Sequence, residues 1–289
     1  MGRFNLLRLR CPLQNRARDS YEPEFMPKSE RNRLALTRLL GPGAGLIQGD
    51  LLTRDRWLWL RSRLPRTAGS EALLDVGCGT GAFTICAALR GYRSLGLTWD
   101  VADAEVATER ARISRAASAR FEVCDVRELD TRGDLKGCFD FVICCENIEH
   151  IIDDRRLAEA IAACLKRGGR LLLSTPNYHY QPISRGDMGP FRPIEDGGHV
   201  RRGYTEGQLR DLFAGTGLII ERVTYCSGFF SQKTTAILRQ FRGKTYVLGW
   251  ALTLPIRLFA PILDAVFHRF SSYPYFTICV EAYRTKWPN

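Results

Sequence analysis

The sequence lacks several features that mark whole classes of protein. It has no internal repeat and no low-complexity tract, which argues against solenoid, collagen-like and wholly disordered chains. No C-x-x-C pair has a second pair behind it, so the usual zinc-ribbon pattern is missing. The first ten residues hold no long apolar core and no small-residue cleavage site, and we therefore expect no secretory signal peptide.

Acidic residues are scarce relative to basic ones. The 289 residues include 42 Lys+Arg against 31 Asp+Glu, a formal net charge of +11. This excess attracts phosphate groups or anionic lipid without distinguishing between them. Several of the ten cysteines lie inside apolar runs, so we interpret them as small buried hydrophobes in a reducing cytosol and expect a cytoplasmic protein. These cysteines are Cys86, Cys144, Cys145, Cys164, Cys226 and Cys279.

Residues 1–45 are rich in arginine and broken by four prolines. This composition is typical of a solvated segment, and we expect a poorly ordered basic N-terminal arm. An arm that touches an anionic surface is the alternative.

Short apolar runs alternate with helical patterns through most of the remaining chain. Strands are expected at 72–76, 94–98, 120–124, 139–145, 170–174, 218–225 and 275–284. Helices are expected at 50–64, 82–90, 101–117, 153–166 and after the capping box of Thr205 and Gln208. This alternation predicts an α/β fold with a doubly wound, mostly parallel sheet and right-handed crossovers.

A glycine-rich turn follows the first apolar strand, in the segment Asp75-Val76-Gly77-Cys78-Gly79-Thr80-Gly81. Glycine permits a tight turn and lets backbone N–H groups approach a ligand. The G-x-G-x-G spacing differs from the G-x-G-x-x-G of dinucleotide binders. A plain turn without a ligand remains an alternative.

Three acids stand at the carboxyl ends of successive expected strands. Asp75 ends a wholly apolar strand, where a carboxylate needs a partner. Asp100 could accept hydrogen bonds from a ribose, and Asp125 could accept one from an adenine amino group. Each acid alone could instead cap a helix.

The DVGCGTG turn, Asp100, Asp125 and the segment FDFVICCENIEH together resemble class I S-adenosylmethionine-dependent methyltransferases of the ubiquinone O-methyltransferase type. The resemblance covers about residues 48–228 and the final strand. It implies a Rossmann-like methyltransferase fold, a seven-stranded mostly parallel sheet with one antiparallel strand. We therefore expect a methyltransferase domain over 46–289.

The resemblance also implies where S-adenosylmethionine binds. The methionine end would lie over the glycine turn, the ribose at Asp100 and the adenine beside Asp125 and Val126, with Cys145 bordering the methyl group. The family often has its ribose acid where Thr98 stands, so Asp100 departs from the pattern. The full expected set is Asp75, Gly77, Cys78, Gly79, Gly81, Asp100, Asp125, Val126 and Cys145.

The segment Glu146-Asn147-Ile148-Glu149-His150 follows the fourth strand and supplies the catalytic candidates, His150 and Glu149. One interpretation is a histidine base oriented by a carboxylate. Another, suggested by the same resemblance, is a divalent-metal site, for example for Mg²⁺, made by Glu146, Glu149 and His150 with a distant fourth ligand in His199. A third is structural: the acids cap a helix and the histidine makes an ordinary hydrogen bond.

Residues 229–274 separate the last two strands, which usually form a close pair in the resembled family. The insertion mixes aromatic and aliphatic residues with cations, which suits an anionic membrane surface or a lipid-acceptor tunnel. A packed lid, a dimer surface and a membrane span are the alternatives. The uninterrupted apolar run 246–256 is too short to span a bilayer, and Pro255, Arg257 and Pro261 interrupt any longer run.

These observations lead to one functional hypothesis and two alternatives. We expect methyl transfer from S-adenosylmethionine to a small, hydrophobic or lipid-like acceptor, at oxygen, by a cytoplasmic enzyme that can bind membranes peripherally. An RNA methyltransferase is the first alternative, but no nucleic-acid-reading module is present, so nucleic acid is not the expected partner. A non-catalytic nucleotide-binding protein of the same fold is the second. The oligomeric state stays open.

Overall fold

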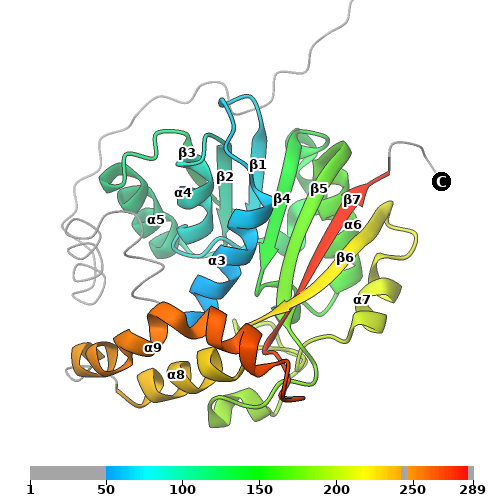
Figure 1. The fold of residues 1–289 in the computed structure, drawn as a ribbon. Coiled ribbons are helices and arrows are strands. Elements are labelled where there is room, and N and C mark those ends of the chain that lie inside the picture. The colour runs from blue at the N-terminus through cyan, green and yellow to red at the C-terminus, as the bar shows by residue number, and fades with distance from the viewer. Residues whose placement is uncertain (1–49, 242–245, 286–289) are drawn as a thin grey trace, which may run out of the picture.

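In the computed structural model, residues 50–241 and 246–285 are described. The basic arm expected over 1–45 lies outside these residues. A single seven-stranded sheet organises the described chain, in the order β3-β2-β1-β4-β5-β7-β6 (Figure 1). β7 runs antiparallel to both neighbours and the other strand pairs are parallel. The predicted fold class is therefore confirmed.

The strands lie close to their predicted positions. They span Ala72–Val76 (β1), Arg93–Thr98 (β2), Ala119–Val123 (β3), Phe139–Cys145 (β4), Leu165–Pro176 (β5), Leu218–Cys226 (β6) and Thr277–Arg284 (β7). β1 is buried along its whole length because helices cover both faces of the sheet. β5 begins directly after a helix that ends at Cys164, so the helix expected over 153–166 ends two residues early and the strand expected at 170–174 begins five residues early.

Helices pack on both faces of the sheet. α3 (Leu51–Arg63), α4 (Ala82–Ala88) and α5 (Val101–Ile113) cover one face, and α6 (Asp154–Cys164) and α7 (Glu206–Phe213) cover the other (Figure 1). Neighbouring residues of β1 accordingly belong to different cores: Leu73 packs with α3, and Leu74 packs with α6. The capping box predicted at Thr205 and Gln208 is present at the start of α7.

The insertion between β6 and β7 forms two helices, α8 (Phe229–Gln240) and α9 (Tyr246–Phe267). The two prolines that interrupt the apolar run in the sequence, Pro255 and Pro261, both lie inside α9 and do not end the helix. Each proline removes one backbone donor and disfavours a helix by about 3 kcal/mol. Packing of α9 along α8 offsets this cost. The expectation of one domain over 46–289 remains a prediction.

The cysteines of the described residues are all free, and Cys86, Cys144, Cys145, Cys164 and Cys279 are buried as predicted. Cys226 is only partly buried, with its Sγ 3.6 Å from the Sγ of Cys279. These side chains fill core volume on both faces of the sheet.

A carboxylate is buried where α3 meets the insertion. Asp55 is 5% exposed and accepts a hydrogen bond from the Ser227 hydroxyl at 3.0 Å. Burial, together with the nearby Asp264 carboxylate, raises the pKa of Asp55 to about 7. Because the folded-state pKa exceeds the unfolded value, the folded protein binds more protons than the unfolded chain between about pH 4 and pH 7. Stability should therefore fall as pH rises through this window.

We expect Asp55→Asn to flatten this pH dependence. The Asp55 contribution reaches a slope of about 1.4 kcal/mol per pH unit. The variant should match the wild type near pH 4 and be more stable at pH 8, as measured by urea unfolding across the range. Asp211→Asn, at an exposed position, controls for the change in net charge. If the free energy of unfolding changes with pH in the same way for the wild type and Asp55→Asn, the pKa of Asp55 is not the cause of the pH dependence.

Candidate active site

The glycine-rich turn joins β1 to α4. Gly77, Gly79 and Gly81 have φ angles of +79°, +48° and +77°, a region that other residues rarely adopt. The N–H groups of Gly77 and Cys78 both donate to the carbonyl of Leu97, which ties the turn to β2. The turn is therefore fixed in place beside the ends of β1 and β2.

The three glycines have different surroundings. A Cβ at Gly77 would lie 2.5 Å from the side chain of Asn147, and one at Gly81 would lie 2.6 Å from the ring of Phe121. A Cβ at Gly79 would meet only Asp103, whose carboxylate oxygen lies 3.9 Å away. Gly77 and Gly81 thus allow close packing of the protein against itself, whereas Gly79 leaves a cradle open.

An open cleft lies over this turn, at the carboxyl ends of β1, β2, β3 and β4. This is the edge at which doubly wound sheets bind ligands. Five residues from the predicted site line the cleft: Gly77, Gly79, Asp125, Val126, and His150. Glu146, a predicted metal ligand, lines it too.

Asp75 supports the turn from below. It is 1% exposed, and its Oδ2 accepts a hydrogen bond from the Thr84 hydroxyl at 2.7 Å. Burial raises the pKa of Asp75 to about 6. Cys78 also points inward, since its Sγ lies 2.7 Å from the position of a Cβ at Gly96. Both residues hold the shape of the turn without lining the cleft.

Two acids follow β2, and their environments differ. The carboxylate of Asp100 accepts hydrogen bonds from the N–H groups of Ala102 and Asp103 and so caps α5. Asp103, one turn later, lines the cleft together with Thr98 and Trp99. Trp99 is 64% exposed, which leaves much of its ring accessible.

A charged bridge crosses the cleft at Asp125. Arg127 bonds to the Asp125 carboxylate and, at 2.8 Å, to Glu195 in the long loop after β5. Glu195 also accepts a hydrogen bond from the N–H of Ile152 at 2.6 Å. Together these contacts fasten the 177–203 loop across the cleft.

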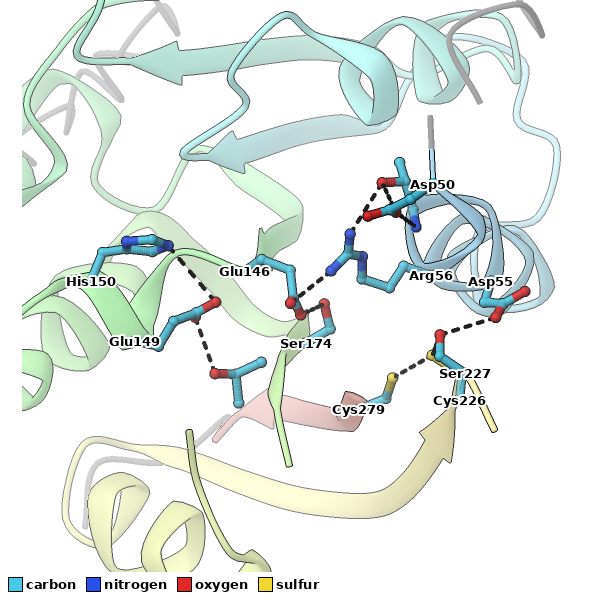
Figure 2. A network of polar contacts seen from close by, with 12 residues as sticks. Asp50, Asp55, Arg56, Glu146, Glu149, His150, Ser174, Cys226, Ser227 and Cys279 are labelled. Atoms are coloured by element: carbon cyan, nitrogen blue, oxygen red, sulfur yellow. Dashed lines mark hydrogen bonds and ion pairs between the residues drawn. The ribbon is translucent and has the colours of Figure 1, made fainter. Parts of the chain in front are cut away.

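The end of β4 forms the opposite wall. Cys145 is 8% exposed, and Glu146 directly after it has φ +51°, a strained conformation for a residue with a side chain. The Glu146 carboxylate pairs with Arg56 of α3 at 2.7 Å and accepts from Ser174 at 3.3 Å (Figure 2). The strained backbone is therefore held by ionic and hydrogen-bonding partners from two other elements.

Glu149 is fully buried behind this wall. Its Oε2 accepts a hydrogen bond from the Thr175 hydroxyl at 3.0 Å, whereas its buried Oε1 has no hydrogen-bond partner among the described residues. Burial and the nearby Glu146 carboxylate raise the pKa of Glu149 well above its usual range. An orphaned carboxylate oxygen in such a place is costly unless a cation or donor joins it.

Two histidines face this oxygen. His150 Nε2 lies 4.0 Å from Glu149 Oε1 (Figure 2). His150 Nδ1 lies 3.0 Å from the carbonyl of Gly198. The rings of His150 and His199 meet edge to face with centroids 4.6 Å apart. Burial, with a smaller effect of His150, lowers the pKa of His199 to about 4, so His199 is neutral at neutral pH.

These side chains could hold a metal ion. One ligand atom from each of Glu149, His150 and His199 lies within 4.8 Å of the others. A cation there would satisfy the orphaned Oε1, and neutral imidazole is the form that binds metals. Glu146 is not part of this group, since its carboxylate is bonded to Arg56 and Ser174. The arrangement fits a divalent ion bound by Glu149, His150 and His199. Of the ligands that the sequence suggested, Glu146 is therefore the one that the structure leaves out.

Several cleft residues had no clear sequence signal. Asp103 lies in the first turn of α5, where an acid is ordinarily read as favourable to the helix dipole. Arg56 lies among other arginines of α3, and Glu195 lies in a loop. For Arg127, its position two residues after Asp125 was a local indication that the two side chains could pair.

A family profile described as a methyltransferase domain matches residues 52–223, more than half of the chain. The chain belongs to this methyltransferase family. Ubiquinone biosynthesis O-methyltransferase of Acinetobacter baylyi is 32% identical over 119 residues, which cover 41% of this chain and 49% of that protein. The chain thus matches about half the length of such curated relatives.

Solved structures share the fold of this methyltransferase. Geranyl diphosphate C-methyltransferase from Streptomyces coelicolor A3(2) has a TM-score of 0.54 at 21% identity, covering 80% of this chain and 77% of that one. Phosphoethanolamine N-methyltransferase 2 of Haemonchus contortus has a TM-score of 0.58 at 19% identity, covering 89% and 57%. These likenesses are to the fold, and their acceptors differ in kind.

The chain is therefore a class I S-adenosylmethionine-dependent methyltransferase, as the sequence predicted. Of the three glycines in the turn, Gly79 is the one whose added Cβ would meet no packed side chain, and it lines the cleft. A non-catalytic protein of the same fold is the less suitable description for a chain of this family.

Proposed function

We propose that the enzyme methylates a hydroxyl oxygen of a small, hydrophobic or lipid-like acceptor. The observation that supports this is the group of Glu149, His150 and His199, whose His150 also lines the cofactor cleft. A hydroxyl must lose its proton as the methyl group arrives, and a histidine is suited to accept it. The name of the Acinetobacter baylyi relative agrees with an oxygen acceptor.

The cleft suggests how S-adenosylmethionine lies. Its methionine end would rest over Gly77 and Gly79, and its adenine would lie beside Asp125 and Val126. We assign the ribose to Asp103 in preference to Asp100, because Asp103 lines the cleft and Asp100 caps α5. The remaining members of the predicted set, Asp75, Cys78, Gly81 and Cys145, would shape the walls.

The cosubstrate supplies an activated methyl group on a sulfonium, so the protein must mainly align the acceptor and exclude water. His150 donates Nδ1–H to the Gly198 carbonyl in this assignment, which leaves Nε2 free to accept the acceptor proton. When bound, S-adenosylmethionine would supply the methyl group and leave as the neutral thioether, and His150 Nε2 would take the proton of the acceptor hydroxyl. The loop that carries Gly198 thereby fixes the tautomer of the base.

A metal-assisted reaction is the second candidate, favoured by the orphaned oxygen of Glu149. Glu149, His150 and His199 would hold a divalent ion such as Mg²⁺ or a transition metal. A bound divalent ion lowers the pKa of a coordinated hydroxyl. In this case His150 is a ligand and does not act as the base.

The experiment is methyl-label transfer from S-adenosylmethionine into a fractionated cell extract. We expect label in the lipid fraction, in a form that is stable to base, as a methyl ether is. Repeating it with EDTA, and then with added Mg²⁺, Mn²⁺ or Zn²⁺, separates the two candidates: loss and recovery of label supports the metal. Label in RNA alone would overturn the proposed acceptor and favour the RNA methyltransferase, whose binding would also weaken steeply with salt.

We also propose that the enzyme is cytoplasmic and binds membranes peripherally. The free cysteines of the described chain are compatible with a reducing compartment. Fractionation of cells into soluble and membrane pools, followed by immunodetection, tests the location directly.

A further inference from the structure

The polarity of α9 is reversed relative to an ordinary surface helix. A surface helix normally buries its apolar side and exposes its polar side. In α9, large apolar side chains point outward, among them Leu252 (59% exposed), Phe259 (57%) and Ile262 (64%). We define the outer face of α9 as Leu248, Leu252, Leu258, Phe259, Ile262 and Val266, all of which are exposed.

The inward side of the same helix is polar. Thr253, Arg257 and Asp264 are 1%, 3% and 5% exposed and lie at helical spacing along one side. Asp264 accepts hydrogen bonds from the N–H groups of Gly228 (3.0 Å) and Phe230 (2.6 Å) at the start of α8. These contacts hold α9 in this orientation, so the outer face cannot turn inward without breaking them.

α9 also differs from the buried core helix of a soluble protein. Leu248–Phe267 is long and apolar enough to cross a membrane, with a mean hydropathy of 1.5, yet only 22% of that stretch is buried. A spanning orientation would separate α9 from α8 or carry its buried Arg257 and Asp264 into hydrocarbon. The helix therefore suits a position along a surface better than a position across a bilayer.

The charged residues of the insertion are almost all of one sign. Residues 229–274 contain six Lys+Arg and a single acid, Asp264, which is buried. Lys233 and Arg269 are exposed cations of this segment. An anionic bilayer complements both the apolar face and these cations. A second copy of the chain would instead bring together two surfaces of like charge.

We propose that the outer face of α9 lies in the headgroup boundary of an anionic bilayer, with the helix parallel to the membrane plane. This inference rests on the proposed function, because a bilayer is where a lipid-like acceptor is found. Beyond that function, it identifies the outer face of α9 as the membrane-binding surface and gives the orientation of the enzyme on the bilayer.

The position of α9 brings the active site close to this surface. α8 follows the carboxyl end of β6, and α8 and α9 lie side by side at the carboxyl edge of the sheet, shown in yellow and orange (Figure 1). The N-terminal end of α3 is joined to α8 by the ion pair of Asp50 and Arg239 at 3.1 Å. α3 also carries Arg56, which bonds to Glu146 in the cleft wall (Figure 2). The docked enzyme thus holds the cleft edge toward the lipid.

Vesicle co-sedimentation of the full chain tests the proposal. The probes are vesicles of phosphatidylcholine alone and of phosphatidylcholine with about one third phosphatidylglycerol. The test variant is Phe259→Asp with Ile262→Asp. The matched control is Leu89→Asp with Ile219→Asp, which adds the same two charges at exposed apolar positions outside the insertion.

We expect the wild type and the control to bind anionic vesicles, and the test variant to bind at least about tenfold more weakly. Binding to neutral vesicles should be weaker, and added salt should reduce binding to anionic ones. Binding of S-adenosylmethionine, measured on each variant, shows that the fold is intact. A test variant that binds vesicles like the control would overturn the proposal.

A second copy as the occupant is a distinct outcome. It predicts a dimer, seen by analytical ultracentrifugation, that the test variant dissociates, with no vesicle binding by the wild type. That result would also overturn the proposal. Vesicle binding needs no methyl acceptor, so methyl label appearing in RNA while vesicle binding persists would refute the proposed acceptor and leave the docking surface standing.

Discussion

The Gly79→Leu variant should bind S-adenosylmethionine with an affinity at least about 100-fold lower than that of the wild type. A side chain at this position projects into the open cleft, where its Cβ meets no protein atom closer than the Asp103 carboxylate at 3.9 Å. The larger side chain would then occupy the volume over which the methionine end of the cosubstrate is placed. Isothermal titration calorimetry with S-adenosylmethionine, or with its demethylated product, measures the effect.

The control must share the backbone strain without touching the cleft. Gly137 has φ +65° and nothing within 4 Å of an added Cβ, so Gly137→Leu carries a comparable strain at a distant loop. Both variants should lose about 1 kcal/mol of stability, from the left-handed conformation alone. Equal stability with cofactor binding lost only in Gly79→Leu supports the assignment. Retained binding in Gly79→Leu would refute the placement of the cosubstrate over this turn.

The sequence predicted β1 and β4 well because these two strands are short and almost fully buried. The expected ranges 72–76 and 139–145 coincide with β1 and β4, whose apolar runs are bounded by sharp changes in composition. The glycine turn and Asp125 were found for a similar reason: the chemistry lies within a few residues of a strand end. Local sequence patterns of this kind can be recognised without knowledge of tertiary contacts.

Other features depend on contacts between distant segments. α9 was missed because two prolines argue against a helix, whereas packing on α8 decides the outcome. The sequence placed the start of α5 correctly and left helix capping open for Asp100. That Asp103 lines the cleft depends on how the segment between β2 and α5 folds over it. The meeting of His150 with His199 depends on the path of a long loop.

The second large effect concerns the histidine at the cleft. His150→Ala should slow methyl transfer by about 10²- to 10⁴-fold, since either a general base or a metal ligand is removed. Cosubstrate affinity should stay close to that of the wild type, because the cradle is formed by the glycine turn and by the ends of β2 and β3. Single-turnover transfer into the labelled extract fraction, with cosubstrate binding measured separately, tests both statements. His179→Ala is the matched control, because His179 is exposed and lies outside the residues that line the cleft.

Glu149→Gln distinguishes the two roles of His150. Burial raises the pKa of Glu149 well above its usual range and so favours the neutral carboxyl. Glutamine has nearly the same shape as that neutral form, and its carbonyl oxygen can still accept the hydrogen bond from Thr175. If His150 is the base, Glu149→Gln should keep activity within about tenfold of the wild type. If the group holds a metal, the variant loses an anionic ligand, and activity should fall with metal affinity and recover in part at high metal concentration. Full activity in His150→Ala would contradict both roles and leave the histidine with a purely structural hydrogen bond to the loop.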